Sequence, residues 1–225
     1  MSWRPSAALV AAEGTAVACF GGAMALYPGG AEHAPGARGH SFWLNYLCDL
    51  TDAQARSGAV NDGALLARLG MAALVIGLAV MFAYAPRAFR SARLALFVRA
   101  VGALAVIATL GVPLSAWLGI AWLHDASVLI AGPLGLLACG AVVLGLARGE
   151  GAAVPTLLGG LTLLAATFDL IVYARCWATG TTWIVLPVAQ RVALLSLLAW
   201  MLALAHHLRA RAAPKDLALA ARDGA

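Results

Sequence analysis

Charged side chains are scarce in this chain of 225 residues. Asp, Glu, Lys and Arg make up 11% of it, whereas an ordinary soluble domain has about 25%. Hydrophobic residues make up 63%, and the mean hydropathy is +0.88. This composition excludes an ordinary globular protein and predicts a membrane protein whose first partners are membrane lipids. The formal net charge is +5, but the basic residues are scattered, so no nucleic acid is expected as a partner.

Cysteine and histidine are sparse as well. The four cysteines lie one per region, without a CxxC pair or the spacing of a metal site. None of the five histidines falls in the middle of an apolar run, which excludes a haem held by paired helix histidines. We therefore expect no metal site and no cofactor. Cys48 and Cys176 fall on the same predicted side of the membrane, where they can form a disulfide if their Cα atoms lie within about 7 Å.

Long apolar runs dominate what is present. Each has close to the roughly 20 residues that a helix needs to cross a membrane, and backbone groups in lipid must be satisfied within the segment, which favours helices. The sequence therefore predicts an all-α polytopic membrane protein, with a six-helix membrane domain over residues 1–208 and a basic cytoplasmic tail over 209–225. The six predicted spans are residues 6–27, 64–85, 94–117, 126–146, 154–175 and 183–206.

The first run has some features of a secretory signal peptide. It follows a basic start and contains an Ala23-x-Ala25 pattern of the kind found at cleavage sites. However, Glu13 interrupts the apolar stretch, and the helical pattern continues to Tyr27. We interpret this run as a retained first transmembrane helix.

The distribution of Lys and Arg predicts the orientation. Most of these residues fall in one set of loops and in the C-terminal tail, and basic loops stay in the cytoplasm. Both termini are therefore expected in the cytoplasm, with the loop 28–63 on the outer side. Richness in Ala and Gly suggests a bacterial source and hence a bacterial inner membrane. The cytoplasmic set is Arg4, Arg87, Arg90, Arg93, Arg148, Arg209, Arg211, Lys215 and Arg222.

The loop 28–63 is the longest polar interval in the chain. In its run 40–52, the residues Ser41, Asn45 and Asp49 recur every four positions. The aromatic and aliphatic residues on the other face are Phe42, Trp43, Tyr46, Leu47 and Leu50. On a helix this spacing opposes a polar face to an apolar face, so it predicts an amphipathic helix at the outer membrane surface. Two interpretations follow. The segment is a linker anchored by its aromatic residues, or it is a lid that aims His40, Asn45 and Asp49 into a site between the helices.

Charged residues inside the predicted spans are costly unless they are paired or hydrated. Counted from the span ends, Asp169 and Arg191 lie at one depth and Glu13 and Arg99 at another, so two buried pairs are predicted, Asp169–Arg191 and Glu13–Arg99. These pairs either only fix the packing of the helices, or they belong to a polar cavity that opens outward. The cavity would be lined by Arg68, Asp169, Gln190 and Arg191 and capped by Asp49. His124, next to Asp125, either joins His40 and Asp49 in a metal or acid–base site or caps the fourth span.

A short motif in the outer loop resembles a known group of proteins. Asn45-x-x-Cys48-Asp49-Leu50 follows a Tyr27-Pro28-Gly29 turn. This arrangement resembles the first outer loop of uncharacterised six-helix bacterial membrane proteins, which in turn resemble the group of DRAM autophagy modulators, Sfk proteins and the Frag lipid-remodelling factor. In this sequence Cys48 stands where the bacterial proteins usually have serine. The resemblance implies the six-span architecture and no particular activity.

Three functions are consistent with these observations. The leading one is an accessory protein that binds a lipid or a membrane-protein partner through the first outer loop and its cavity. The second is a membrane enzyme acting on a lipid headgroup or acyl chain, which requires His40, Asp49, His124 and Arg191 to converge. The third is a small transporter, favoured by the charges within the spans but disfavoured by the lack of internal repeats.

Overall fold

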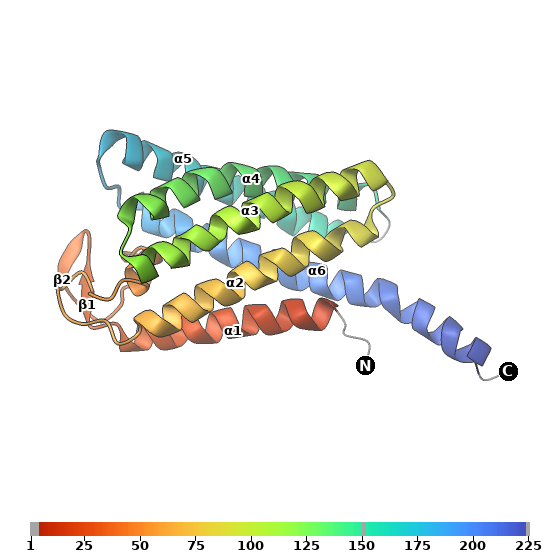
Figure 1. The fold of residues 1–225 in the computed structure, drawn as a ribbon, viewed down its shortest axis with the longest axis horizontal. Coiled ribbons are helices and arrows are strands. Elements are labelled where there is room, and N and C mark those ends of the chain that lie inside the picture. Colours follow the sequence, from red (N-terminus) through yellow and green to blue (C-terminus); the bar gives the residue numbers. More distant parts are fainter. Residues whose placement is uncertain (1–4, 150–151, 224–225) are drawn as a thin grey trace.

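The computed structural model describes residues 5–149 and 152–223, with side chains as far as Arg211. Six helices in this part of the chain are long and apolar enough to cross a membrane (Figure 1). The predicted all-α, six-span architecture is therefore confirmed. The helices are α1 (Pro5–Leu26), α2 (Ala64–Tyr84), α3 (Ala92–Leu118), α4 (Ala121–Ala147), α5 (Ala153–Thr179) and α6 (Val185–Asp223).

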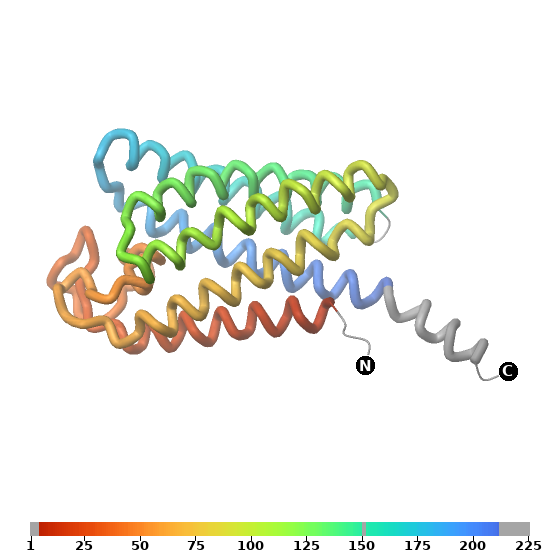
Figure 2. Tube along the Cα trace, in the orientation of Figure 1, coloured from red at the N-terminus to blue at the C-terminus, as the bar shows by residue number. Residues whose placement is uncertain are grey.

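The helices form a closed ring. Each helix packs against the next one along the chain, and α6 returns to pack against α1. Consecutive helices alternate in direction, so α1 begins and α6 ends at one end of the bundle, while the loop 28–63 lies at the other end (Figures 1 and 2). We call these the terminal end and the loop end, and we call residues 28–63 the long loop.

Several helix ends follow from local sequence. The Ser91 hydroxyl accepts a hydrogen bond from the Leu94 amide and caps α3. Gly119 and Gly180 have positive φ values of 67° and 62° after the ends of α3 and α5, a conformation that residues with a Cβ disfavour. Because α3 ends at Leu118, α4 can begin at Ala121, five residues before the predicted start. His124 is therefore inside α4 and does not cap it.

The long loop is not the amphipathic helix that its spacing predicts. It contains a small antiparallel hairpin of β1 (Gly29–Ala31) and β2 (Ala34–Arg38), then turns, and then one 3₁₀ turn, η1 (Cys48–Leu50). The same two polar residues account for the difference. Asn45 Oδ1 accepts a hydrogen bond from the Ser41 amide, and Asp49 Oδ2 accepts one from the Tyr46 amide. Short polar side chains that bond to the backbone in this way compete with helix formation.

Two apolar clusters hold the bundle together. One fills the terminal half and joins α1, α2, α3, α4 and α6 around Trp200 and Met201. The other joins α1, α2 and the long loop around Phe20 and Leu50. The helices in the first cluster approach closely, since a Cβ added to Gly102 would meet the ring of Phe82. A cavity remains between α2, α3, α4, α5 and α6 on the side of the bundle nearer the loop end.

Candidate functional site

A cavity of about 340 Å³ lies inside the ring beneath the long loop. Its walls come from α2, α3, α4, α5 and α6, and its roof comes from Leu47, Cys48 and Thr51 of the long loop. On α4 the lining extends from His124 to Cys139, which is about 22 Å along the helix axis. A spherical cavity of the same volume would have less than half that length, so the cavity is elongated along the bundle.

The face of α5 that lines the cavity changes in character along its length. Thr162, Ala166, Asp169 and Tyr173 line the cavity and are separated by four, three and four residues, the spacing of one helix face. Toward the terminal end this face meets mainly apolar side chains of the other helices, such as Phe82. Toward the loop end it carries the carboxyl group of Asp169 and the phenol of Tyr173. The cavity is thus a long apolar space with polar groups at one end.

At this polar end three side chains are tied to one another. The Tyr173 hydroxyl donates a hydrogen bond of 2.6 Å to Asp125 Oδ1. His124 Nδ1 lies 3.3 Å from the same oxygen and 3.4 Å from the Tyr173 hydroxyl oxygen. Asp169 differs, because its Oδ1 is buried and has no hydrogen-bond partner among the described residues. The Asp169 side chain as a whole is half-buried and lines the cavity, so its carboxyl group lies where a molecule inside the cavity would meet it.

Gln190 connects α6 to the roof. It lines the cavity, and its Oε1 accepts a hydrogen bond of 3.1 Å from the Leu47 amide. The adjacent roof residue Cys48 is half-buried, and desolvation of its thiol, together with the nearby carboxylates of Asp49 and Asp52, raises the pKa of this thiol to about 12. Cys48 is therefore a neutral thiol at physiological pH, and it closes the cavity without acting as a thiolate nucleophile.

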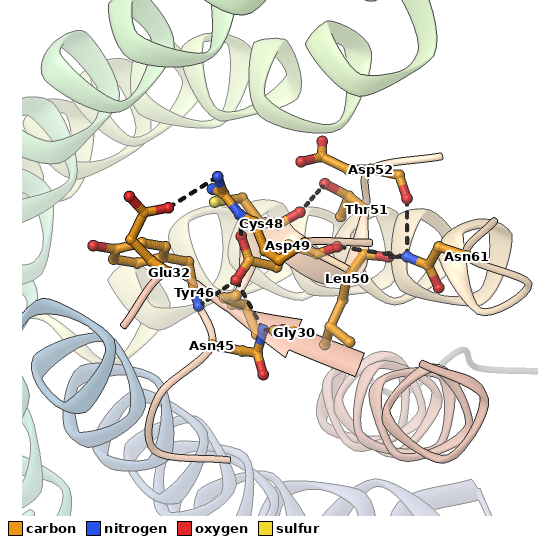
Figure 3. A network of polar contacts seen from close by, with 12 residues as sticks. Gly30, Glu32, Asn45, Tyr46, Cys48, Asp49, Leu50, Thr51, Asp52 and Asn61 are labelled. Atoms are coloured by element: carbon orange, nitrogen blue, oxygen red, sulfur yellow. Dashed lines mark hydrogen bonds and ion pairs between the residues drawn. The ribbon is translucent and has the colours of Figure 1, made fainter. Parts of the chain in front are cut away.

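Asp49 organises the loop above this roof (Figure 3). Its buried carboxylate accepts hydrogen bonds from Asn45 Nδ2 at 3.1 Å, from the Tyr46 amide at 2.9 Å and from Arg56 Nε at 2.8 Å. Arg56 also forms an ion pair with Glu32 at 3.1 Å. The lid interpretation aims Asn45 and Asp49 into a site between the helices, but in the structure both side chains point into this network. They hold together residues 45–61 of the long loop, which we call the cover.

A second amide fixes the end of the same cover. Asn61 Nδ2 donates to the carbonyl groups of Leu50 and Asp52 at 3.0 and 2.9 Å, and Asn61 Oδ1 accepts from the Gly63 amide at the start of α2. Figure 3 shows this amide beside the η1 turn. Asn61 thus ties the η1 turn and the residues after it to the start of α2.

Arg191 and His40 support the long loop at a different place. Arg191 is 1% exposed, donates from Nη2 to the Asn45 carbonyl at 2.9 Å and lies over the Phe42 ring. His40 contacts the Tyr27 ring edge-on. Burial, and secondarily the charge of Arg191, lowers the pKa of His40 to about 4, so this imidazole is neutral at physiological pH. Neither residue lines the cavity described above.

The predicted pair of Asp169 and Arg191 does not form. Arg191 is bonded to the long loop, and Asp169 Oδ1 has no partner among the described residues. The reason is the rotation of α6. Gln190 and Asp169 both line the cavity, and Arg191, the next residue on α6, is turned from Gln190 by about 100°. The equal depth predicted from the sequence is therefore not sufficient to predict a contact between the two side chains.

The predicted pair of Glu13 and Arg99 is also wrong. Glu13 is buried, and neither carboxylate oxygen has a hydrogen-bond partner within the described chain. Arg99 is exposed on α3, whereas α1 packs against α2 and α6. Depth alone does not specify which helices are neighbours in the ring.

Arg68 lies at the rim and not in the cavity lining. Its Nε donates to the Thr51 carbonyl at 2.9 Å, and its guanidinium lies 5.0 Å from the centre of the Trp117 ring. Of the eight predicted site residues, the cavity therefore brings together His124, Asp169 and Gln190. Tyr173 was missed, although it stands four residues after Asp169, on the same helix face.

The four residues that the enzyme hypothesis requires fall into two groups. His40, Asp49 and Arg191 belong to the long loop and its support, while His124 is bonded to Asp125 and Tyr173 at the cavity. Within the described residues, no group of three His, Cys, Asp or Glu side chains has the arrangement of a metal site. Cys48 and Cys176 pack against the same small apolar cluster, but both are free thiols, so the possible disulfide is not formed.

The fold and the cavity together define a class, a multi-pass membrane protein with a ligand-sized space inside its helix ring. No protein-family model, curated protein or solved structure matches the chain.

Proposed function

We propose that this protein is an accessory membrane protein that binds a lipid-like molecule in the cavity beneath the long loop. The observation that carries the proposal is the shape and lining of the cavity. Its volume of about 340 Å³ lies within the roughly 300–1,000 Å³ of small-molecule sites. Its length and apolar walls suit a hydrocarbon chain, and the polar groups at the loop end suit one polar head.

The architecture supports this role in a second way. Two hydrogen bonds hold the long loop to α6: Gln190 Oε1 accepts from the Leu47 amide, and Arg191 Nη2 donates to the Asn45 carbonyl. A bound chain would therefore be shielded from water at the loop end by a structured cover. Each methylene buried from water contributes about 0.8 kcal/mol, so a long chain gains much of its affinity from such shielding.

We further propose that the protein lies in a bacterial inner membrane with both termini in the cytoplasm. The support is the excess of Arg and Lys at the terminal end, including Arg87, Arg90 and Arg93. A bound molecule would then have its head toward the outer side and its chain toward the membrane interior, as lipids of the outer leaflet have. Reporter fusions are expected to behave as cytoplasmic after Ala225 and as periplasmic at Gly58, and the reverse result would contradict this orientation.

Two glycines of α4 provide a matched test of binding. Gly135 lines the cavity, Gly140 does not, and a Cβ added to either meets no atom within 4 Å. A leucine at position 135 would occupy space that the bound chain needs. We expect Gly135→Leu to reduce the amount of co-purifying ligand at least about tenfold, measured by native mass spectrometry of the purified protein.

Gly140→Leu is the control, because it makes the same chemical change on the same helix outside the cavity lining. It should retain as much ligand as the parent protein. Both variants should fold, since replacing a glycine within a helix by leucine favours the helix. Equal ligand content in the parent, Gly135→Leu and Gly140→Leu would contradict binding in the cavity.

A further inference from the structure

We infer that the ligand of this cavity is a long-chain amine, an apolar chain attached directly to a protonated amino group. This inference rests on the proposed function and specifies the class of its ligand. The amino group would lie against Asp169, and the chain would extend along α4 and α5 toward the terminal end.

The first argument for an amine is the charge of the side chains that line the cavity. Among the described residues that line the cavity, Asp169 is the one carboxylate, and no Lys or Arg is present. A primary alkyl amine is protonated at neutral pH, as the lysine side chain is. Its charge is therefore complementary to the one acidic group of the walls, whereas a fatty acid or a phosphate would meet a group of like charge.

The second argument is the pattern of hydrogen bonds at the polar end of the cavity. The nearby carboxylate of Asp125 already accepts from the Tyr173 hydroxyl, but Asp169 Oδ1 is buried without a partner in the described chain. A buried carboxylate oxygen without a donor is costly. An ammonium group has three donors and no acceptor, so it can bond to Asp169 and still donate to the oxygen of the Tyr173 hydroxyl, one turn nearer the loop.

The third argument is the position of the neighbouring guanidinium groups. An anionic head would need a cation at the polar end, and neither of the two arginines near it lines the cavity. Arg68 bonds to the Thr51 carbonyl and stacks on Trp117. Arg191 donates from Nη2 to the Asn45 carbonyl, and its Nε and Nη1 are buried without a partner among the described residues. A phosphate between the amine and the chain would likewise lack a cation, so the amine is joined directly to the chain.

Three chains of equal length with different heads test this inference. Isothermal titration of the full-length protein in a maltoside detergent would compare dodecylamine, dodecanol and dodecanoic acid, with a lysophosphatidylethanolamine as a fourth probe and protein-free micelles as the blank for partition. We expect dodecylamine to bind at least about tenfold more tightly than dodecanol, because a hydrogen bond to a charged group exceeds a neutral one by this amount. Dodecanoic acid and a lysophosphatidylethanolamine should bind more weakly than dodecylamine.

Asp169→Asn keeps the shape of the side chain and removes its charge. It should lower the affinity for dodecylamine to that for dodecanol while leaving dodecanol binding within about threefold of the parent. The control is Asp62→Asn, which removes a carboxylate exposed at the surface and should leave the preference unchanged. Because the ranking of the four probes is measured on the parent protein, the inference can be tested even if Asp169→Asn folds poorly.

The outcomes separate this inference from the proposed function. If the probes bind, if Gly135→Leu blocks them, and if dodecylamine has no advantage, the cavity binds lipid-like chains but the amine inference is wrong. The same conclusion follows if Asp169→Asn keeps the preference for amine. If Gly135→Leu binds every probe as well as the parent does, the proposed function itself is contradicted.

Discussion

Replacing Gly30 by alanine is expected to destabilise the long loop by at least about 3 kcal/mol. Gly30 has a φ of +84°, which a residue with a Cβ adopts only with strain. In addition, a Cβ at this position would overlap the Ser57 amide nitrogen and the Arg56 carbonyl carbon. These are backbone atoms, so no side-chain rotation relieves the overlap. The Gly30 carbonyl also accepts a hydrogen bond from Asn45 Nδ2 at 2.7 Å, and moving β1 would weaken it.

The half-buried thiol of Cys48, which lines the cavity beneath the cover, can report this effect. In a variant whose other three cysteines are replaced by alanine, we expect a bulky maleimide to label Cys48 when the cover opens. A cost of about 3 kcal/mol corresponds to an increase in labelling rate of roughly a hundredfold. Gly36→Ala is the matched control, because Gly36 lies in the same hairpin, lacks a positive φ and would place its Cβ in open space. Equal labelling rates for the two alanine variants would contradict the described packing of the loop.

Asp49→Ala is expected to lower the free energy of unfolding of the cover by about 3 kcal/mol. The substitution removes an acceptor from three donors, on Asn45, Tyr46 and Arg56. Arg56 is partly exposed and can be hydrated after the loss, and Asn45 keeps its bond to Gly30. The Tyr46 amide is left buried without this acceptor, so the expected cost lies at the low end for a broken buried charge network.

The same labelling of Cys48 measures this cost. Asp62→Ala is the control, because Asp62 is an exposed carboxylate of the same loop and its removal changes the net charge equally. We expect faster labelling for Asp49→Ala and an unchanged rate for Asp62→Ala. If both variants are labelled at the rate of the parent, Asp49 does not hold the cover closed.

The spans could be predicted from the sequence because length and hydropathy specify membrane crossing without knowledge of the tertiary structure. The predicted start at residue 64 agrees with α2, which begins at Ala64. The largest error at a helix start occurred at α4, where Gly119 allows a tight turn and the helix begins at Ala121. That difference also changes the environment of His124, from a loop residue to a residue that lines the cavity.

The candidate site was less accessible from the sequence. Depth counting predicted Asp169 and Arg191 at the same level, but pairing also depends on the rotation of each helix, which their spacing in the chain does not give. In the long loop the spacing of Asn45 and Asp49 was correctly noticed. The predicted amphipathic helix was wrong. The Asn45 and Asp49 side chains accept hydrogen bonds from backbone amides of their own segment, and these bonds compete with helix formation.

Neighbouring leucines on two helices allow the most direct test of the central claim, that a chain-like molecule occupies the cavity. Leu136 and Leu163 line the cavity, whereas Leu137 and Leu164 are 57% and 71% exposed on the outer surface of the bundle. A dodecylamine carrying a photoreactive diazirine in its chain would be bound and irradiated, and the modified residues would be mapped by mass spectrometry. We predict adducts at Leu136 and Leu163 that excess dodecylamine suppresses. Adducts confined to Leu137, Leu164 and other exposed residues, without suppression, would show that the chain lies outside the bundle and would contradict the account.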